Sequence, residues 1–273
     1  MSYRIVCCDL DGTLLDNQSE ISAENFRAIE EMAQKGIHFV PSTGRTYSEI
    51  PEAIRNNTDI RYIIHSNGAA VLDKKTDHRY LTCMSNETVK AILDILADYE
   101  GHITLRHGGN SYVDSEFVQD SHFEYYNLSR EHRIVVHTCS QALSNFREFI
   151  RNAEDVEVIS VFFHSREELS ACRERLERSA GLRVAAAAEY NLEIMNAHAG
   201  KGNALYTLAD MLDIDRAATI AMGDSNNDES IVRAAGLGLA VSNACESLKA
   251  AADAVICSNE EHAVEYVLHR YCQ

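Results

Sequence analysis

The chain carries the sequence RIVCCDLDGT at residues 4–13. Residues 4–8 are short, apolar and β-branched, which predicts a buried strand that delivers Asp9 to its carboxyl end. Side chains two apart in an extended segment point the same way, so we expect Asp9 and Asp11 to face one site. Two carboxylates this close repel each other, which favours a bound cation or a shared proton, with one group acting as nucleophile and the other as general acid. The simpler alternative is a polar turn, since Asp-Gly is a common turn dipeptide.

A second apolar strand is predicted at residues 36–41, and it ends in Ser42-Thr43-Gly44-Arg45. A hydroxyl group and nearby backbone N–H groups can hold a phosphoryl oxygen. This segment is therefore a candidate phosphate-binding loop with a cation beside it.

Lys201 stands between two glycines at the start of a helical pattern that covers residues 203–212. A cation is poorly placed against the positive end of a helix dipole, so helix stability does not explain this lysine. We expect it to neutralise phosphate and carboxylate charge. The alternative is a solvated surface lysine, since lysine side chains are mostly exposed.

The apolar residues 218–222 predict another strand, which runs into the sequence GDSNND at residues 223–228. Oxygen-rich loops of this kind suit Mg²⁺, a hard cation that prefers carboxylates, water and substrate phosphate. An Asx-rich cap for the next helix is the alternative, and both interpretations can hold together.

The segments DLDGTLLD, STGR, GKGNAL and GDSNND resemble, in identity and order, the four motifs of the haloacid dehalogenase-like hydrolases. Their spacing resembles that of the Cof-type (IIB) phosphatases, in which a large α/β cap is inserted between the second and third motifs. The resemblance implies that Asp9 is the nucleophile and Asp11 the general acid and base. It also implies that the phosphoryl group is bound by Thr43, Gly44, Lys201 and Asn227.

The same resemblance implies a bound Mg²⁺ ion. Its ligands would be Asp9, the backbone carbonyl of Asp11, and Asp224. Asp228 and Arg45 would complete the surroundings of the metal and the phosphate.

The composition limits the possible partners. The net charge of −17 argues against nucleic acid and anionic membranes, because both require a cationic surface. The eight cysteines include no C-x-x-C pair, which predicts reduced, buried thiols, and no segment approaches 18 uninterrupted apolar residues. We therefore expect a cytoplasmic protein that binds a small-molecule phosphate ester, with its oligomeric state left open.

Strands alternate with helical patterns along the chain, which predicts an α/β fold with parallel sheets covered by helices. We predict a doubly wound, Rossmann-like core from residues 1–83 and 190–273, including a third strand at 61–65, and an inserted α/β cap at 84–189. All four motifs then lie at the carboxyl ends of core strands, where open α/β sheets bind ligands. The cap is left to select the substrate.

These observations predict a Mg²⁺-dependent phosphatase that hydrolyses a small phosphorylated metabolite through an aspartyl-phosphate. The resemblance favours a sugar phosphate, with flavin or pyridoxal phosphate as further options. One alternative is a phosphomutase that uses the same intermediate. Another is a regulatory protein that binds a phosphorylated metabolite without turning it over.

Overall fold

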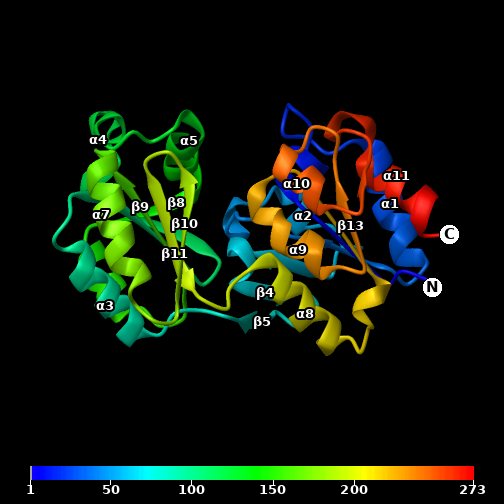
Figure 1. Ribbon diagram of the computed structural model, residues 1–273, viewed down its shortest axis with the longest axis horizontal. Helices are drawn as coiled ribbons and strands as arrows, with labels where there is room; N and C mark the ends of the chain where they lie inside the picture. Colours follow the sequence, from blue (N-terminus) through cyan, green and yellow to red (C-terminus); the bar gives the residue numbers. More distant parts are fainter. Residues whose placement is uncertain (1) are drawn as a thin grey trace. The chain divides into compact units, whose positions relative to one another are not determined.

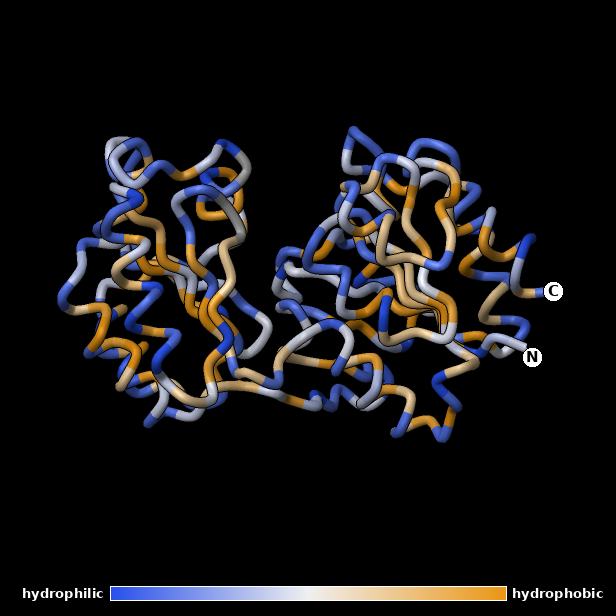
Figure 2. Tube along the Cα trace, in the orientation of Figure 1, coloured by the Kyte–Doolittle hydropathy of each residue, from blue (hydrophilic) through white to orange (hydrophobic). Residues whose placement is uncertain are grey.

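The computed structural model describes residues 2–273, and the chain divides into two compact units (Figure 1). The first unit contains the residues through Gly44 together with Pro51–Tyr80 and Gly200–Gln273. The second contains Arg45–Ile50 and Leu81–Ala199. Figure 2 shows that apolar residues gather along the central strands of each unit.

The first unit is built on a five-stranded parallel sheet with the order β14-β13-β12-β1-β2. Its strands are β1 (Ile5–Cys8), β2 (His38–Pro41), β12 (Thr219–Gly223), β13 (Leu237–Ala240) and β14 (Ala254–Val255). The chain passes from β1 to β2 on one side and later enters β12 on the other side of β1. Open α/β sheets bind ligands beside such a reversal of strand order, outside the carboxyl ends of the strands.

Helices cover both faces of this sheet. They are α1 (Ala23–Gln34), α2 (Glu52–Arg55), α8 (Lys201–Met211), α9 (Glu229–Ala234), α10 (Glu246–Ala251) and α11 (Ala263–Tyr271). Ile5 and Cys7 share a core with apolar side chains of α8 and α9, while Val6 and Cys8 point to the opposite face and are also fully buried. Figure 1 shows α1 and α11 side by side, and α1 packs against β2. A strand buried on both faces is apolar throughout, which explains the unbroken run in β1.

The predicted third strand does not extend the parallel sheet. It is β3 (Tyr62–His65), which pairs antiparallel with β4 (Ala70–Asp73), and β5 (His78–Leu81) lies on the other side of β4. A single parallel bridge between Ser42 and Ile64 connects β3 to the end of β2. The chain returns from β3 to β4 through a short turn, and such short connections join antiparallel strands.

The second unit contains a six-stranded sheet with the order β10-β11-β9-β6-β7-β8, in which β7 and β8 are parallel and the other pairs antiparallel. The strands are β6 (Gly101–His107), β7 (Asn110–Asp114), β8 (Ser140–Leu143), β9 (Val156–Phe163), β10 (Leu182–Ala188) and β11 (Asn191–Asn196). The helices are α3 (Asn86–Leu96), α4 (Asp120–Tyr125), α5 (Arg130–Cys139), α6 (Phe146–Asn152) and α7 (Arg166–Glu177). Short helical turns of the chain lie at Leu10–Leu14, Tyr47–Glu49, Ser66–Gly68, Ser115–Phe117, Arg216–Ala218, Asn226–Asp228 and Asn259–Glu261.

Alternation along β9 separates two cores in the second unit. Val161 and Phe163 pack with α3, α6 and α7, whereas Phe162 packs with α4 and α5 on the opposite face. The sheet is thus covered on both sides, and the predicted α/β class is confirmed for the chain as a whole.

The second unit differs in extent from the predicted segment 84–189. It continues to Ala199, because β11 pairs with both β9 and β10 and so belongs to the second sheet. It also includes Arg45–Ile50, where the backbone N–H of Ser48 donates to Gly109 O at 2.9 Å. Contacts this far apart in sequence leave no local pattern that would predict them.

Candidate active site

The nucleophile candidate Asp9 follows β1, an interior strand of the first sheet. All residues of β1 are 0 % exposed, and the backbone N–H of Asp9 donates to Met222 O of β12 at 3.0 Å. The Asp9 side chain is itself buried. This pairing places the carboxylate at the carboxyl edge of the sheet, where the strand order reverses.

The turn Leu10–Leu14 follows Asp9 immediately. It is closed by hydrogen bonds from Leu14 N to Asp9 O at 3.2 Å and from Leu15 N to Leu10 O at 2.9 Å. The extended path that the sequence analysis assumed from Asp9 to Asp11 is therefore wrong. Asp11 is exposed whereas Asp9 is buried, and the role of Asp11 at the site stays a prediction.

Gly12 makes this turn possible. Its φ of +75° lies in the left-handed region, which glycine adopts without strain. A Cβ atom at this position would lie 2.8 Å from a carboxylate oxygen of Asp224. The glycine of the first motif therefore lets the turn approach the loop that carries Asp224.

Lys201 opens α8, as predicted, but the interpretation as a solvated lysine is wrong because the residue is 1 % exposed. Its Nζ donates to Asp9 Oδ1 at 2.7 Å and to Asp228 Oδ1 at 2.6 Å. Two charge-assisted hydrogen bonds account for a cation at a helix N-terminus, where the dipole alone would disfavour it.

The loop after β12 supplies two further carboxylates. Asp228 is 0 % exposed, and its Oδ2 accepts hydrogen bonds from the backbone N–H groups of Asp224 and Ser225, each at 3.1 Å. Thr13 Oγ1 donates to Asp224 Oδ1 at 3.3 Å. The Asx-rich segment is thus both a cap and part of the acidic group, which the two open interpretations of the sequence allowed.

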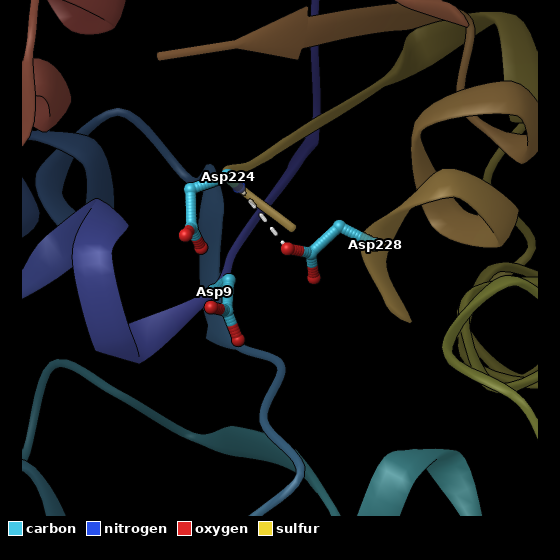
Figure 3. Close-up of side chains that lie close together, drawn as sticks. All are labelled: Asp9, Asp224 and Asp228. Carbon is cyan, nitrogen blue, oxygen red and sulfur yellow. Dashed lines mark hydrogen bonds between the residues drawn. The ribbon is translucent and has the colours of Figure 1, made fainter. Parts of the chain in front are cut away.

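Asp9, Asp224 and Asp228 form a compact acidic cluster, shown in Figure 3. Each offers a carboxylate oxygen within 4.8 Å of those of the other two. The sequence predicts Asp228 in the surroundings of the metal and the backbone carbonyl of Asp11 among its ligands. The cluster of side-chain oxygens includes Asp228 beside Asp9 and Asp224.

Burial and mutual repulsion raise the pKa values of two carboxylates of this cluster. Burial, followed by the charge of Asp228, raises the pKa of Asp9 well above its usual range and raises the pKa of Asp224 to about 6. Burial opposes the charge on Lys201, but Asp9 and Asp228 outweigh it and raise the pKa of this lysine. One ammonium group leaves an excess of negative charge, and a hard divalent cation bound to these oxygens would compensate for it. The donor set therefore fits such an ion.

The loop after β2 reaches the same region through residues that follow β3. The buried Thr43 donates its N–H to Ile64 O at 2.9 Å, and its carbonyl accepts from Asn67 N at 3.1 Å. A Cβ on Gly44 would lie 3.0 Å from Asn67 Oδ1, and one on Gly68 would lie 2.3 Å from Gly200 O. The Thr43 loop is thus linked by Asn67 and Gly68 to the start of α8, where Lys201 lies.

Two of the candidate residues lie outside these contacts. Arg45 belongs to the second unit, where its Nη1 donates to Glu49 O at 3.0 Å. Asn227 is exposed, and its Oδ1 accepts from Ser225 Oγ at 2.6 Å. Both remain predictions as phosphate-site residues.

Residues 6–268 match the family of haloacid dehalogenase-like hydrolases. The chain belongs to this family. The resemblance noted from the four motifs, including that to the Cof-type branch, is thereby confirmed over nearly the whole chain.

Members of this family with known names are similar to the chain along their full length. Phosphatase YwpJ of Bacillus subtilis (strain 168) is 29 % identical, and the alignment covers 97 % of this chain and 98 % of that protein. The 5-amino-6-(5-phospho-D-ribitylamino)uracil phosphatase YwtE of the same strain is also 29 % identical, with coverage of 97 % and 96 %.

Solved structures confirm the fold. A haloacid dehalogenase-like hydrolase from B. subtilis superimposes with a TM-score of 0.79 at 29 % identity, covering 98 % of this chain and 99 % of its own. The HAD subclass IIB sugar phosphatase BT4131 superimposes with a TM-score of 0.77 at 20 % identity, covering 98 % of both chains, and this likeness concerns the fold alone.

Sequence reasoning missed several residues of this site. Thr13, whose hydroxyl donates to Asp224, follows the carboxylate motif directly, and that position is the signal that could have found it. Asn67 stands in the turn dipeptide Asn67-Gly68 after β3, and its φ of +55° explains why an asparagine suits the position. The turn signal was visible, but the contact of this turn with Thr43 and α8 was not.

Proposed function

We propose that the protein is a Mg²⁺-dependent phosphatase that acts on a small phosphorylated metabolite. One observation carries the proposal: in a chain of this family, the buried Asp9 carboxylate lies at the edge of the parallel sheet, bonded to Lys201 and clustered with Asp224 and Asp228. A carboxylate held against a buried cation can serve as a nucleophile.

In the proposed reaction a carboxylate oxygen of Asp9 forms a bond to phosphorus while the bond from phosphorus to the ester oxygen breaks. Asp11 donates a proton to the departing oxygen, which leaves as an alcohol. Asp11 then takes a proton from water as the water oxygen attacks phosphorus. The bond to Asp9 breaks, inorganic phosphate is released and the Asp9 carboxylate is restored.

The Asp9 carboxylate and the phosphate ester are both anions, so positive charge must offset their repulsion. The phosphoryl group must also be held in line with Asp9. Lys201 already contacts Asp9, and Thr43 with the backbone amide of Gly44 would bind phosphoryl oxygens. Asp9, Asp224 and the backbone carbonyl of Asp11 would hold Mg²⁺, which when bound supplies positive charge to the phosphoryl oxygens. The additional carboxylate of Asp228 holds Lys201 beside Asp9.

We propose a sugar phosphate as the first substrate class, with flavin and pyridoxal phosphates next, and we assign substrate choice to the second unit. A relative supports a substrate of this kind, since YwtE is named for a substrate with a phosphorylated ribityl chain. The cytoplasmic location and the lack of nucleic-acid and membrane partners stay predictions from composition; no helix of residues 2–273 is long and apolar enough to cross a bilayer.

A panel of phosphate esters, assayed with Mg²⁺ and with EDTA, tests the proposal. We expect phosphate release from p-nitrophenyl phosphate and from several sugar or polyol phosphates, and its loss in EDTA. Water labelled with ¹⁸O separates the phosphomutase, since hydrolysis places the label in inorganic phosphate whereas transfer back to substrate does not. A protein that binds panel members but releases no phosphate would be the regulatory alternative.

A further inference from the structure

A short segment after β13 contacts both loops that carry the acidic cluster. Asn243 Nδ2 donates to Gly12 O at 2.8 Å, in the turn that contains Asp11. Two residues later, the backbone N–H of Cys245 donates to Asp224 O, also at 2.8 Å. This segment therefore ties the position of the turn to that of the metal loop.

A second asparagine supports the first. Asn259 donates its backbone N–H to Asn243 Oδ1 at 3.0 Å, and its Nδ2 donates to Leu15 O at 3.0 Å. Asn259 is 6 % exposed, whereas Asn243 is exposed. The pair thus holds the turn at two carbonyl groups, one at Gly12 in its middle and one at Leu15 just beyond its end.

The buried side chains of Leu10, Thr13 and Leu14 anchor the turn on both sides of Asp11 and Gly12, and Asn243 contacts its middle. The backbone angles of Asp11 and Gly12 depart from helical geometry. One of the two hydrogen bonds that close the turn, from Leu14 N to Asp9 O, is 3.2 Å long. The Gly12 carbonyl lies in the rigid peptide plane shared with Thr13, whose hydroxyl contacts Asp224. Fixing that carbonyl therefore restrains Asp11 on one side and Thr13 on the other.

We propose that Asn243 is a positioning residue for Asp11, held in its own orientation by Asn259. The inference rests on the proposed function, in which Asp11 moves a proton to and from the reacting oxygen. A role in folding alone does not suit Asn243, because an exposed side chain contributes little to stability. Misplacement of a catalytic group by about 1 Å can slow a reaction up to about 100-fold.

The variant Asn243→Ala tests this with p-nitrophenyl phosphate and Mg²⁺. We expect kcat to fall by about tenfold or more, with KM changed less than about threefold and the melting temperature nearly unchanged. Asn86→Ala is the matched control: Asn86 Nδ2 donates to Arg151 O, also at 2.8 Å, in the second unit. We expect the control to keep its kcat. Equal kcat values in Asn243→Ala and the wild type would overturn the proposal, as would a parallel fall in kcat and melting temperature.

Amide hydrogen exchange supplies a readout that needs no activity. In Asn243→Ala the N–H groups of Leu14 and Leu15 should exchange about tenfold faster, because the turn opens more often. Asn86→Ala should leave them unchanged. Unaltered exchange in Asn243→Ala would overturn the inference even in an active phosphatase. If the wild type releases no phosphate, the proposed function fails, and exchange still decides whether Asn243 holds the turn.

Discussion

Each unit holds a cationic side chain near three carboxylates, the buried Lys201 in the first and the partly buried Arg106 in the second. The two arrangements differ in how the carboxylates are held. In the first unit Lys201 bonds to Asp9 and Asp228, and Asp224 completes a group whose oxygens lie within 4.8 Å of one another. Asp228 Oδ2 also accepts from two backbone N–H groups, but one oxygen from each of the three carboxylates converges on the other two. The group thus concentrates negative charge at one point.

In the second unit Arg106 forms an ion pair with Glu193 at 2.9 Å, and Glu157 and Glu49 lie close enough to raise the pKa of the arginine against the effect of its burial. Two of these carboxylates accept hydrogen bonds from backbone N–H groups. Glu157 Oε1 accepts from Gly109 N at 2.7 Å, and Glu49 Oε2 accepts from Thr46 N at 2.9 Å. In the part of the chain that the structure describes, the glutamates do not form a group that could share one ion.

Neither the burial of carboxylates nor the number of charges is enough to identify a reactive site. Buried carboxylates that each bond to a nearby N–H group stabilise a local fold. Carboxylates that converge without enough hydrogen-bond donors leave negative charge uncompensated. A bound cation can neutralise that charge. The following experiments test this distinction.

The largest effect should come from Asp9→Asn, which we expect to lower turnover by about 1,000-fold or more, since an amide is a far poorer nucleophile than a carboxylate. The melting temperature in EDTA should not fall, because the change removes one charge from a cluster with excess negative charge. Asp59→Asn, at an exposed site of the same unit, is the control for activity. A variant that kept more than a tenth of wild-type turnover would move the nucleophile elsewhere.

Replacing Lys201 or Arg106 by methionine should lower the free energy of unfolding. The response to Mg²⁺ should then differ between the two variants. Lys201→Met and Arg106→Met each leave buried carboxylates uncompensated, at an expected cost of about 3–5 kcal/mol in EDTA. Mg²⁺ should restore part of the stability of Lys201→Met, because the converging oxygens can share the ion. Mg²⁺ should not restore the stability of Arg106→Met. Denaturant unfolding with and without Mg²⁺ measures both, and equal recovery would contradict the distinction.

Local patterns in the sequence were enough to predict the strands that end at the site. The run before Asp9 is apolar and β-branched, and parallel strands bring their carboxyl ends to one edge, so Asp9 and Asp224 were expected together. The burial of Lys201 was not accessible in this way. It depends on Asp9 and Asp228, which are 192 and 27 residues away in the chain.

The path of the chain after Asp9 and the extent of the second unit also escaped prediction. The hydrogen bonds from Leu14 N to Asp9 O and from Leu15 N to Leu10 O turn the chain directly after Asp9, where alternation was assumed. Strand β11 has the sequence NLEIMN, and this local pattern does not specify which of the two sheets the strand joins. Helices α4 and α5 share a core with Phe162 and Val113, and these distant partners cannot be predicted from the sequence of either helix.

A smaller effect should appear in the pH dependence of the second unit. His102 is 1 % exposed among the rings of Phe117, Phe123, Tyr126 and Phe162, and neither of its ring nitrogens has a hydrogen-bond partner. Burial, with a contribution from His122, lowers the pKa of His102 from 6.5 to about 4. The unfolded chain therefore binds the proton more readily than the folded one between these values, so stability should fall as the pH drops from about 6.5 to about 4, by up to about 3 kcal/mol.

Replacing His102 by phenylalanine should remove this loss and keep the aromatic packing. The difference in unfolding free energy between His102→Phe and the wild type should grow as the pH is lowered through that window and level off below about pH 4. His269→Phe, at an exposed site near the chain end, is the control and should show no such growth. A difference that stays constant from pH 7 to pH 4 would show that His102 does not resist protonation in the folded state.

The smallest effect we predict compares one carboxylate from each cluster. Asp224→Asn removes one anionic oxygen from the converging group while Asp9 and Asp228 remain. The Mg²⁺ concentration that gives half-maximal turnover should rise by about tenfold, and much of the turnover should return at high Mg²⁺. Glu193→Gln changes charge in the same way beside Arg106, where the carboxylates do not converge, so its Mg²⁺ requirement should match that of the wild type.

If both variants shifted the Mg²⁺ requirement equally, the effect would reflect net charge rather than coordination, and Asp224 would not be a ligand. If neither shifted it, the cation would have to be held by other oxygens. A shift in Asp224→Asn alone would show that the convergence of the carboxylates, rather than their burial, makes this edge of the sheet a metal site.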